Sequence, residues 1–394
     1  MKRTPKICLI SNPDSIHVRR WARHFSEREF DVTLLTFYQP ESEPIPGVEV
    51  QFVHPRTPSV TAGGRSRAAR SAQRFPGLLR LATAARYRRS RFYRLLERIN
   101  PDVLHAHYVS DYGFLAALSK RHPLVVSAWG SDILVDPGLS PITRRVVRWV
   151  LGQADLVTYD AERVREVAEG QGASSGRMLR VVLGVDRDLL DALKSRMIPP
   201  AARPPVILSL RSLERTLYNV DVIIEAMPAV LAKVPNTRLL IGNDGALRPQ
   251  LEGQARGLGV ESAVEFVGMA HGPVALAELL GPAAVYVSVP SSDGTSVSLL
   301  EAMAAGAYPV VSDLPANREW VGAEGGTVVP PGQAAPLADA IAAALTDPSS
   351  RESAAKHNQE LVVQQGLWDA NMARMEDAYR GLAGVGVNAG GATR

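Results

Sequence analysis

The chain has 394 residues, of which 46% are hydrophobic and 21% charged, so it is long enough to bury two ordinary cores. Its formal net charge is only +4, which gives no ground for a nucleic-acid partner. Its single cysteine, Cys8, excludes a disulfide framework, and no apolar run reaches the roughly 20 residues that span a bilayer. We therefore expect a protein of the cell interior with a buried, inert thiol.

The N-terminal stretch predicts a strand, a helix and a second strand. Apolar runs at 6–11 and 31–37 are typical of buried strands, and the helix expected at 17–29 carries Trp21 and Phe25 on one face. This order is typical of a doubly wound parallel sheet. The intervening loop, SNPDSIH, lacks the glycine pattern of a dinucleotide fingerprint, so no nicotinamide cofactor is expected.

An arginine-rich segment spans residues 65–98. Eleven arginines accompany one acid, Glu97, and the leucines and phenylalanines between them predict two helices with an apolar and a basic face. One hypothesis is contact with an anionic membrane surface or an anionic acceptor. The alternative is an ordinary solvated helix face. The segment contains no nucleic-acid-binding module, so no such partner is expected.

Residues 101–135 predict two further strands, VLHAH and PLVVSAW, with a helix between them. Because ligands bind at the carboxyl ends of strands in open α/β sheets, the polar side chains that follow these strands are candidate site residues. They are His107, Tyr108, Asp111 and Asp132. We expect His105 to point to the opposite face from His107 and to be packed.

The first domain is expected to cover residues 1–194. Asp186 and Asp188 form an Asp-X-Asp pattern that can hold a divalent metal, but their place before a predicted helix favours a cap at Asp186, so no metal site is expected. The run 195–205 contains four prolines and predicts a linker.

Beyond this run the alternation of strands and helices begins again and predicts a second doubly wound domain over residues 206–366. Strands are expected at VILSLRSL, TRLLIGND, AVEFVG and AVYVSVP. A last helix is expected at 367–383. The small and polar residues 384–394 are expected to be disordered.

The stretch 288–312, SVPSSDGTSVSLLEAMAAGAYPVVS, predicts a strand, a turn, a helix from Leu299 and the next strand. The free N–H groups and the dipole of a helix N-terminus suit a phosphate. Asp293 precedes the helix and Glu301 lies on its first turn, so both could accept hydrogen bonds from sugars at the ends of a diphosphate. The alternative is that the polar residues only cap a packed helix. The amides and hydroxyls there belong to Gly294, Thr295, Ser296, Val297 and Ser298.

The run PSSDGTSVSLLEAMAAGAYPVV is similar to the signature of retaining glycosyltransferases of family 4, in which two acidic residues spaced by seven frame the donor site. Most of the family has glutamate where this chain has Asp293. The resemblance covers most of residues 6–380. It implies the GT-B architecture, in which two doubly wound α/β domains face each other across a ligand-binding cleft.

The same resemblance implies a reaction without a metal or cofactor. A sugar would move from a nucleotide-diphosphate donor, UDP- or GDP-linked, to a hydroxyl of a small-molecule, lipid-linked or glycan acceptor, with retention at the anomeric carbon. Two alternatives stay open, the second because a lysine and a histidine of the family are absent. They are a nucleotide-sugar epimerase of the same fold and a non-catalytic nucleotide-sugar-binding scaffold.

The resemblance further implies roles for individual residues. Arg211 would face the diphosphate, Asp293 and His107 the transferred sugar, and Glu301 the ribose. Arg215 or Tyr218 would replace the missing lysine, and Trp129 stands in place of the missing histidine. The loops at Asn243 and Gly268 would edge the base. The acceptor-side candidates are Asn12, Ser15, His17 and Asp132.

Overall fold

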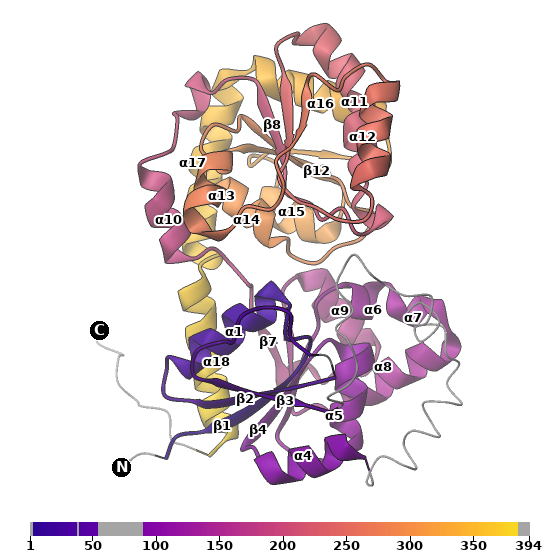
Figure 1. Cartoon of the computed structure of the whole chain (residues 1–394), viewed down its shortest axis with the longest axis vertical. Helices are drawn as coiled ribbons and strands as arrows, with labels where there is room; N and C mark the ends of the chain where they lie inside the picture. The colour runs from indigo at the N-terminus through magenta and orange to yellow at the C-terminus, as the bar shows by residue number, and fades with distance from the viewer. Residues whose placement is uncertain (1–2, 38, 54–89, 385–394) are drawn as a thin grey trace. The chain divides into compact units, whose positions relative to one another are not determined.

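Short aliphatic runs form thirteen strands in two parallel sheets within residues 3–37, 39–53 and 90–384, which are the residues that the structure, a computed structural model, describes. The chain divides into unit 1, Met1–Val181 with Met372–Arg394, and unit 2, Val182–Asn371. In each unit helices cover both faces of the sheet (Figure 1). The predicted fold class of two doubly wound parallel-sheet domains is confirmed.

Unit 1 has a seven-stranded sheet in the order β3-β2-β1-β4-β5-β6-β7, and every neighbouring pair is parallel. The chain order reverses direction between β1 and β4, and such a switch point is where open α/β sheets bind ligands. Strand β3 was not predicted. The strands are β1 (Lys6–Ile10), β2 (Asp31–Thr36), β3 (Val48–Phe52), β4 (Val103–His107), β5 (Leu124–Ser127), β6 (Leu156–Tyr159) and β7 (Met178–Arg180).

The helices of unit 1 bury the faces that the sequence pattern indicates. Trp21 and Phe25 of the first helix are each 1% exposed, as predicted. Cys8 is buried, which raises the pKa of its thiol to about 12 despite the opposing charge of Arg121. The helices are α1 (Ile16–Ser26), α4 (Arg91–Ile99), the π-helix η1 (Val109–Gly113), α5 (Phe114–Leu118), α6 (Ser131–Leu134), α7 (Asp136–Leu139), α8 (Pro141–Gln153), α9 (Glu162–Gly170) and the 3-10 helix η2 (Ser175–Arg177).

Unit 2 has a six-stranded parallel sheet in the order β10-β9-β8-β11-β12-β13. Successive residues of a strand point to opposite faces. Ile207 and Val285 therefore join one core and Leu208 and Tyr286 the other. The strands are β8 (Val206–Ser209), β9 (Arg238–Ile241), β10 (Val264–Phe266), β11 (Val285–Ser288), β12 (Tyr308–Ser312) and β13 (Thr327–Val329).

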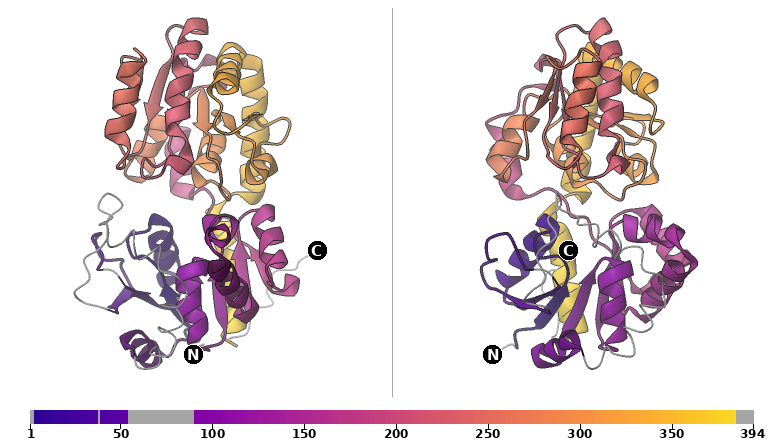
Figure 2. Two further views of the ribbon diagram at one scale, coloured as in Figure 1. Left: turned by 90° about the vertical axis from the view of Figure 1, so that its right-hand side faces the viewer. Right: turned by 45° about the vertical axis from the view of Figure 1, so that its right-hand side comes forward.

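Two groups of helices cover the unit 2 sheet, with α11, α12 and α16 on one face and α10, α13, α14 and α17 on the other (Figure 2). The helix α18 (Trp368–Leu382) begins in unit 2, and its residues from Met372 onward belong to unit 1. The helices of unit 2 are α10 (Arg187–Lys194), η3 (Pro200–Ala202), η4 (Thr216–Tyr218), α11 (Val220–Lys233), α12 (Arg248–Gly257), α13 (Gly272–Leu280), α14 (Val297–Ala304), α15 (Pro315–Val321), α16 (Ala334–Thr346) and α17 (Pro348–Gln365).

The division between the units falls earlier than the predicted domain end at residue 194. Leu189 and Leu193 pack in the core of unit 2, and residues 195–205, expected as a linker, lie inside that unit. Arg203 fixes this segment, since its Nε donates to the carbonyl of Ile198 at 2.9 Å and its Nη1 to that of Ala283 at 2.7 Å. The prolines thus mark an entry segment of unit 2.

Two predictions fall largely outside the described residues. Of the arginine-rich segment 65–98, only the part from Ser90 is described, and there α4 buries Phe92, Leu95 and Leu96. The tail predicted to be disordered lies outside the described residues from 385 onward.

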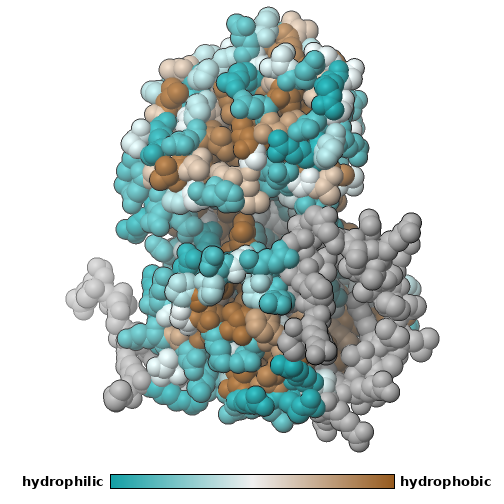
Figure 3. Space-filling view, in the orientation of Figure 1, coloured by the Kyte–Doolittle hydropathy of each residue, from teal (hydrophilic) through white to brown (hydrophobic). Residues whose placement is uncertain are grey.

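In Figure 3 hydrophobic patches interrupt a mainly hydrophilic surface on both units. None of the described helices has the length and hydropathy of a membrane span.

Candidate functional site

Arg211 follows strand β8 of unit 2 and lies at the centre of a polar cluster. Its Nη2 is 2.7 Å from Oδ2 of Asp293, and its Nη1 donates to Oγ of Ser296 at 2.9 Å. The ring of Tyr218 lies 4.3 Å from the guanidinium carbon, within the range of a cation–π contact. Three predicted donor-site residues, Arg211, Asp293 and Ser296, are thus in direct contact, and Tyr218 packs against them.

The electrostatics of this cluster keep Arg211 charged. Burial by itself would lower the pKa of its guanidinium, but the charge of Asp293 and the nearby Tyr286 outweigh burial and raise it. Nε of Arg211 is buried and has no hydrogen-bond partner among the described residues. The cluster therefore contains a buried cation that still has donor capacity, which suits an anionic ligand.

The helix α14 begins beside this cation. Ser296 is its N-cap, and the Ser296 hydroxyl accepts a hydrogen bond from the Leu299 N–H at 3.4 Å. Ser298 Oγ lies 2.7 Å from the Tyr286 hydroxyl and 3.1 Å from Ser296 Oγ. The capping alternative is thus true of Ser296, while the arginine contact adds a feature that capping does not require.

The flanking residues of the motif are also held in place. Thr295 Oγ1 accepts a hydrogen bond from Trp320 Nε1 at 3.2 Å, and the Gly294 N–H lies 3.1 Å from Oδ1 of Asp293. The helix begins at Val297 rather than at the predicted Leu299, so the partly buried Glu301 lies just beyond the first turn.

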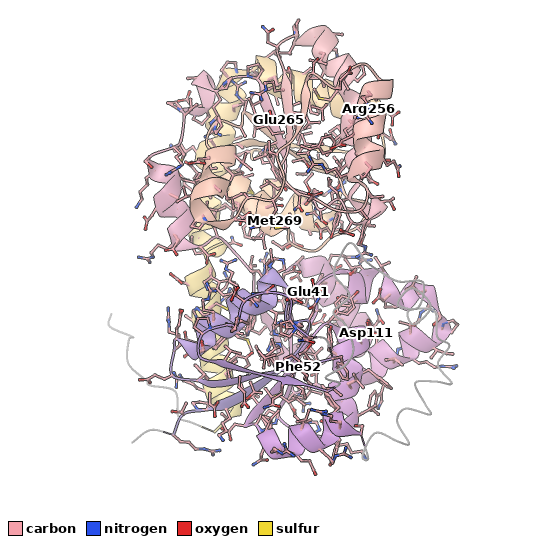
Figure 4. The ribbon with its side chains drawn as sticks, viewed as in Figure 1. Glu41, Phe52, Asp111, Arg256, Glu265 and Met269 are labelled. Atoms are coloured by element: carbon pink, nitrogen blue, oxygen red, sulfur yellow. The ribbon has the colours of Figure 1, made fainter. Side chains whose placement is uncertain are left out.

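The remaining donor-side candidates lie in loops of unit 2. Asn243 Nδ2 donates to the carbonyl of Leu210 at 3.0 Å, and Gly268 has a φ of 75°, a conformation that favours glycine. Met269, labelled in Figure 4, is the exposed neighbour of that glycine. Arg215 is exposed and its side chain makes no ion pair or hydrogen bond with a described residue, so Tyr218, not Arg215, touches the Arg211 cluster.

In unit 1, His107 ends strand β4 and is completely buried. Its ring meets those of Trp21 and Trp129 edge-on, with centroid distances of 5.0 and 5.1 Å. Neither ring nitrogen has a hydrogen-bond partner among the described residues. Burial, together with the charge that His17 would carry, lowers the pKa of His107 to about 3, so the imidazole is neutral at physiological pH.

The predicted orientation of His105 is wrong, although its predicted packing is confirmed. Residues two apart on a strand share a face, and the His105 and His107 rings lie 4.3 Å apart. His105 Nε2 contacts Ser127 Oγ at 2.7 Å, and its Nδ1 pairs with the Tyr379 hydroxyl of α18. Burial and the neighbouring His107 lower the pKa of His105.

Asp132, an acceptor-side candidate, is fully buried between two backbone segments. Its Oδ2 accepts the Val109 N–H at 2.8 Å and its Oδ1 accepts the Trp129 N–H at 3.0 Å. Burial raises the pKa of Asp132 to about 7, even though these hydrogen bonds oppose the shift. The carboxylate thereby joins the residues after β4 to those after β5.

The other acceptor-side candidates lie around the start of α1. Asn12 Oδ1 accepts the Asp14 N–H at 3.0 Å, and Ser15 is the N-cap residue without a side-chain cap hydrogen bond. Asp14 instead accepts N–H groups of the loop at Glu41, labelled in Figure 4. His17 meets Trp129 edge-on at 5.7 Å, and burial with the charge of Arg20 lowers its pKa to about 4.

The Asp-X-Asp pattern of the sequence lies at the start of α10. Asp186 is the N-cap residue, as predicted, but its side chain makes no cap hydrogen bond. Within residues 3–37, 39–53 and 90–384 no group of three or more His, Cys, Asp or Glu side chains is placed to hold a metal ion.

Two family models match the chain, one in each half. Residues 6–161 match "Glycosyl transferase 4-like" and residues 194–361 match "Glycosyl transferases group 1". The first match includes β1 to β6 and the second includes α14 with its signature. Together the two matches cover the sheets of both units except β7.

Characterised relatives are similar over part of their length. Phosphatidyl-myo-inositol mannosyltransferase of Mycobacterium leprae is 33% identical over 183 residues, which are 46% of this chain and 47% of that protein. N-acetyl-alpha-D-glucosaminyl L-malate synthase of Bacillus anthracis is 25% identical over 228 residues, 55% of this chain and 58% of that protein. The chain thus spans about half the length of these curated relatives.

Solved structures are similar over nearly the whole chain. Sucrose-phosphate synthase of Thermosynechococcus elongatus superposes with a TM-score of 0.73 at 20% identity, covering 97% of this chain and 100% of that one. Anabaena HepE in complex with UDP-glucose superposes with a TM-score of 0.71 at 18% identity, covering 96% and 100%. At these identities the likeness establishes the fold, and the expected GT-B architecture is confirmed.

Proposed function

We propose that this chain, whose two matched domains and fold make it a member of the GT-B glycosyltransferases, transfers a sugar from a nucleotide-diphosphate donor to an acceptor hydroxyl. The observation that carries the proposal is the buried Arg211 beside the N-terminus of α14, with Asp293 and Ser296 in contact. This arrangement suits the charge of a diphosphate. The solved Anabaena complex with UDP-glucose supports a nucleotide-sugar donor.

The proposed reaction proceeds with retention of configuration. In this scheme Arg211 and the N–H groups at the start of α14 stabilise the negative charge that develops on the leaving diphosphate, because preorganised donors in a dry site cost no reorganisation. Asp293 holds hydroxyls of the transferred sugar, and Glu301 holds the ribose. The leaving phosphate accepts the proton of the acceptor.

The proposal includes metal independence, since Arg211 would neutralise the diphosphate. Enzyme treated exhaustively with EDTA should therefore keep most of its rate with a UDP- or GDP-sugar. Complete loss, with recovery when magnesium or manganese is added, would contradict this and return attention to Asp186 and Asp188.

A donor screen and product analysis test the reaction itself. We expect one of a set of UDP-, GDP- and dTDP-sugars to raise the melting temperature, and product formation to require a small-molecule, lipid-linked or glycan acceptor. Release of an epimerised sugar without acceptor would favour the epimerase, and tight binding without turnover would favour a scaffold. The proposed location is the cytoplasm, with peripheral contact at the inner membrane face.

A further inference from the structure

The helices α7 and α8 of unit 1 carry an exposed face that the proposed reaction does not use (Figure 1). Leu139 is 71% exposed, and Ile142 and Trp149 are each 38% exposed. These three account for a third of the nine large exposed hydrophobic side chains among the described residues, yet they lie within eleven positions of the sequence. Such clustering indicates a surface with a partner.

The helical geometry of α8 places apolar and basic side chains next to each other. Ile142 and Trp149 are seven residues apart and so lie on one line along the helix. The exposed arginines 144, 145 and 148 occupy the adjoining part of the exposed arc, while Val147, Val150 and Leu151 are buried on the other side. Phe114 meets the Trp149 ring edge-on at 5.9 Å, which fixes the indole at the surface.

The charge of this face is not neutralised within the described chain. The segment Pro141–Gln153 contains no acidic residue, and the side chains of its arginines make no ion pair or hydrogen bond with a described residue. The nearby carboxylate of Asp136 on α7 is engaged by the hydroxyls of Tyr108, at 3.1 Å, and Ser110, at 2.8 Å. The next helix, α9, differs, because Arg163 pairs there with Glu166 at 3.1 Å.

We propose that this α7–α8 face, formed by Leu139, Ile142, Trp149 and the three arginines, docks on an anionic lipid bilayer. Guanidinium groups bind lipid phosphates, an indole favours the membrane interface, and the two aliphatic side chains can enter the acyl boundary. A nucleic acid would use the cations but would leave Leu139 and Ile142 in water. The surface is additional to residues 65–98, and the inference does not depend on the transfer reaction.

Vesicle binding of the full chain tests this inference. We compare co-sedimentation with phosphatidylcholine vesicles and with mixed phosphatidylcholine–phosphatidylglycerol vesicles, for wild type and for three variants. The triple variant R144Q/R145Q/R148Q should bind the anionic vesicles about 100-fold more weakly, given about fivefold per arginine. Trp149→Ala should weaken binding by roughly fivefold, because an interfacial indole is lost. Arg163→Gln, the matched control, should bind as wild type does.

Either of two results would overturn the inference. In the first, both α8 variants bind the vesicles as wild type does. In the second, binding is lost only in a variant of the arginine-rich segment, R86E/R88E/R89E/R91E. Binding of a duplex oligonucleotide that falls with the triple variant but not with Trp149→Ala would assign the face to nucleic acid instead. Circular dichroism of each variant verifies folding, which these exposed positions should not disturb.

Discussion

At the carboxyl edge of the unit 2 sheet a buried arginine meets a carboxylate and a hydroxyl, whereas at the same edge of unit 1 the buried His107 ring packs against two indoles and the buried Asp132 accepts backbone N–H groups. Arg211 remains charged because Asp293 and Tyr286 raise its pKa. His107 remains neutral because burial lowers its pKa to about 3. Among the described residues of these two edges the buried cation lies in unit 2, and we therefore expect a diphosphate to be neutralised there.

The largest effect should come from Arg211→Ala, which removes the buried cation. We expect the affinity for UDP to fall by more than 100-fold, about 3–5 kcal/mol, because the anion loses its charge partner and Asp293 loses its own. Titration calorimetry measures this. The control His107→Leu, in unit 1, should leave UDP affinity unchanged; a variant without Arg211 that still binds within twofold of wild type would contradict the comparison.

The acidic pair within unit 2 should separate binding from turnover. Glu301→Ala should weaken donor binding by about 1.5–3 kcal/mol, the worth of a charged hydrogen bond. Asp293→Ala should mainly lower kcat, and its loss frees Nη2 of Arg211, now 2.7 Å away, for the phosphate. Steady-state kinetics with varied donor distinguishes the two effects. Equal kinetics for wild type and both variants would remove the assignment.

Replacing each of the two neighbouring histidines of unit 1 should change the free energy of unfolding by different amounts. His105→Leu should cost about 1–3 kcal/mol, because the Ser127 and Tyr379 hydroxyls lose their partner. His107→Leu should cost less than about 1 kcal/mol, because neither nitrogen is bonded to a described residue. Urea unfolding followed by tryptophan fluorescence measures both. Equal losses would mean that the His107 nitrogens have partners in solution.

Much of the fold followed from the sequence because buried strands are short aliphatic runs, as in β8 and β11. Strand β3 was missed although Val48, Val50 and Phe52 alternate with polar residues, so here the sequence did carry the pattern of a half-buried strand. The helix α8 was missed because its apolar residues lie on both the buried and the exposed side. Element boundaries also shifted, as at α14, which begins at Val297 rather than at Leu299.

The candidate site was predictable residue by residue but not contact by contact. The motif identified Asp293 and Ser296, yet their bonds to Arg211 span 82 and 85 positions of the sequence, and only tertiary folding creates them. The wrong face for His105 was an error in applying strand alternation rather than a limit of the sequence. The burial of His107 beneath Trp129 could not be inferred from a strand pattern alone.

The last prediction concerns Asp132, which is the one carboxylate of the unit 1 edge shown to be fully buried among the described candidates. Burial raises its folded-state pKa to about 7, against about 3.9 in the unfolded chain. Between these values the folded state binds more protons than the unfolded state, so this carboxylate makes unit 1 less stable as the pH rises from 4 to 7. The penalty levels off at about one pH unit above this folded-state pKa.

His107 opposes this trend, because its lowered pKa makes the folded state lose stability as the pH falls below about 6.5. A wild-type profile alone therefore mixes both groups, and the difference from Asp132→Asn isolates the carboxylate. Relative to wild type, the variant should gain about 1 kcal/mol of folding stability between pH 6 and pH 7, a little less than the free energy that corresponds to one pKa unit. Melting temperatures across this range measure the gain, and parallel profiles would show that Asp132 titrates normally.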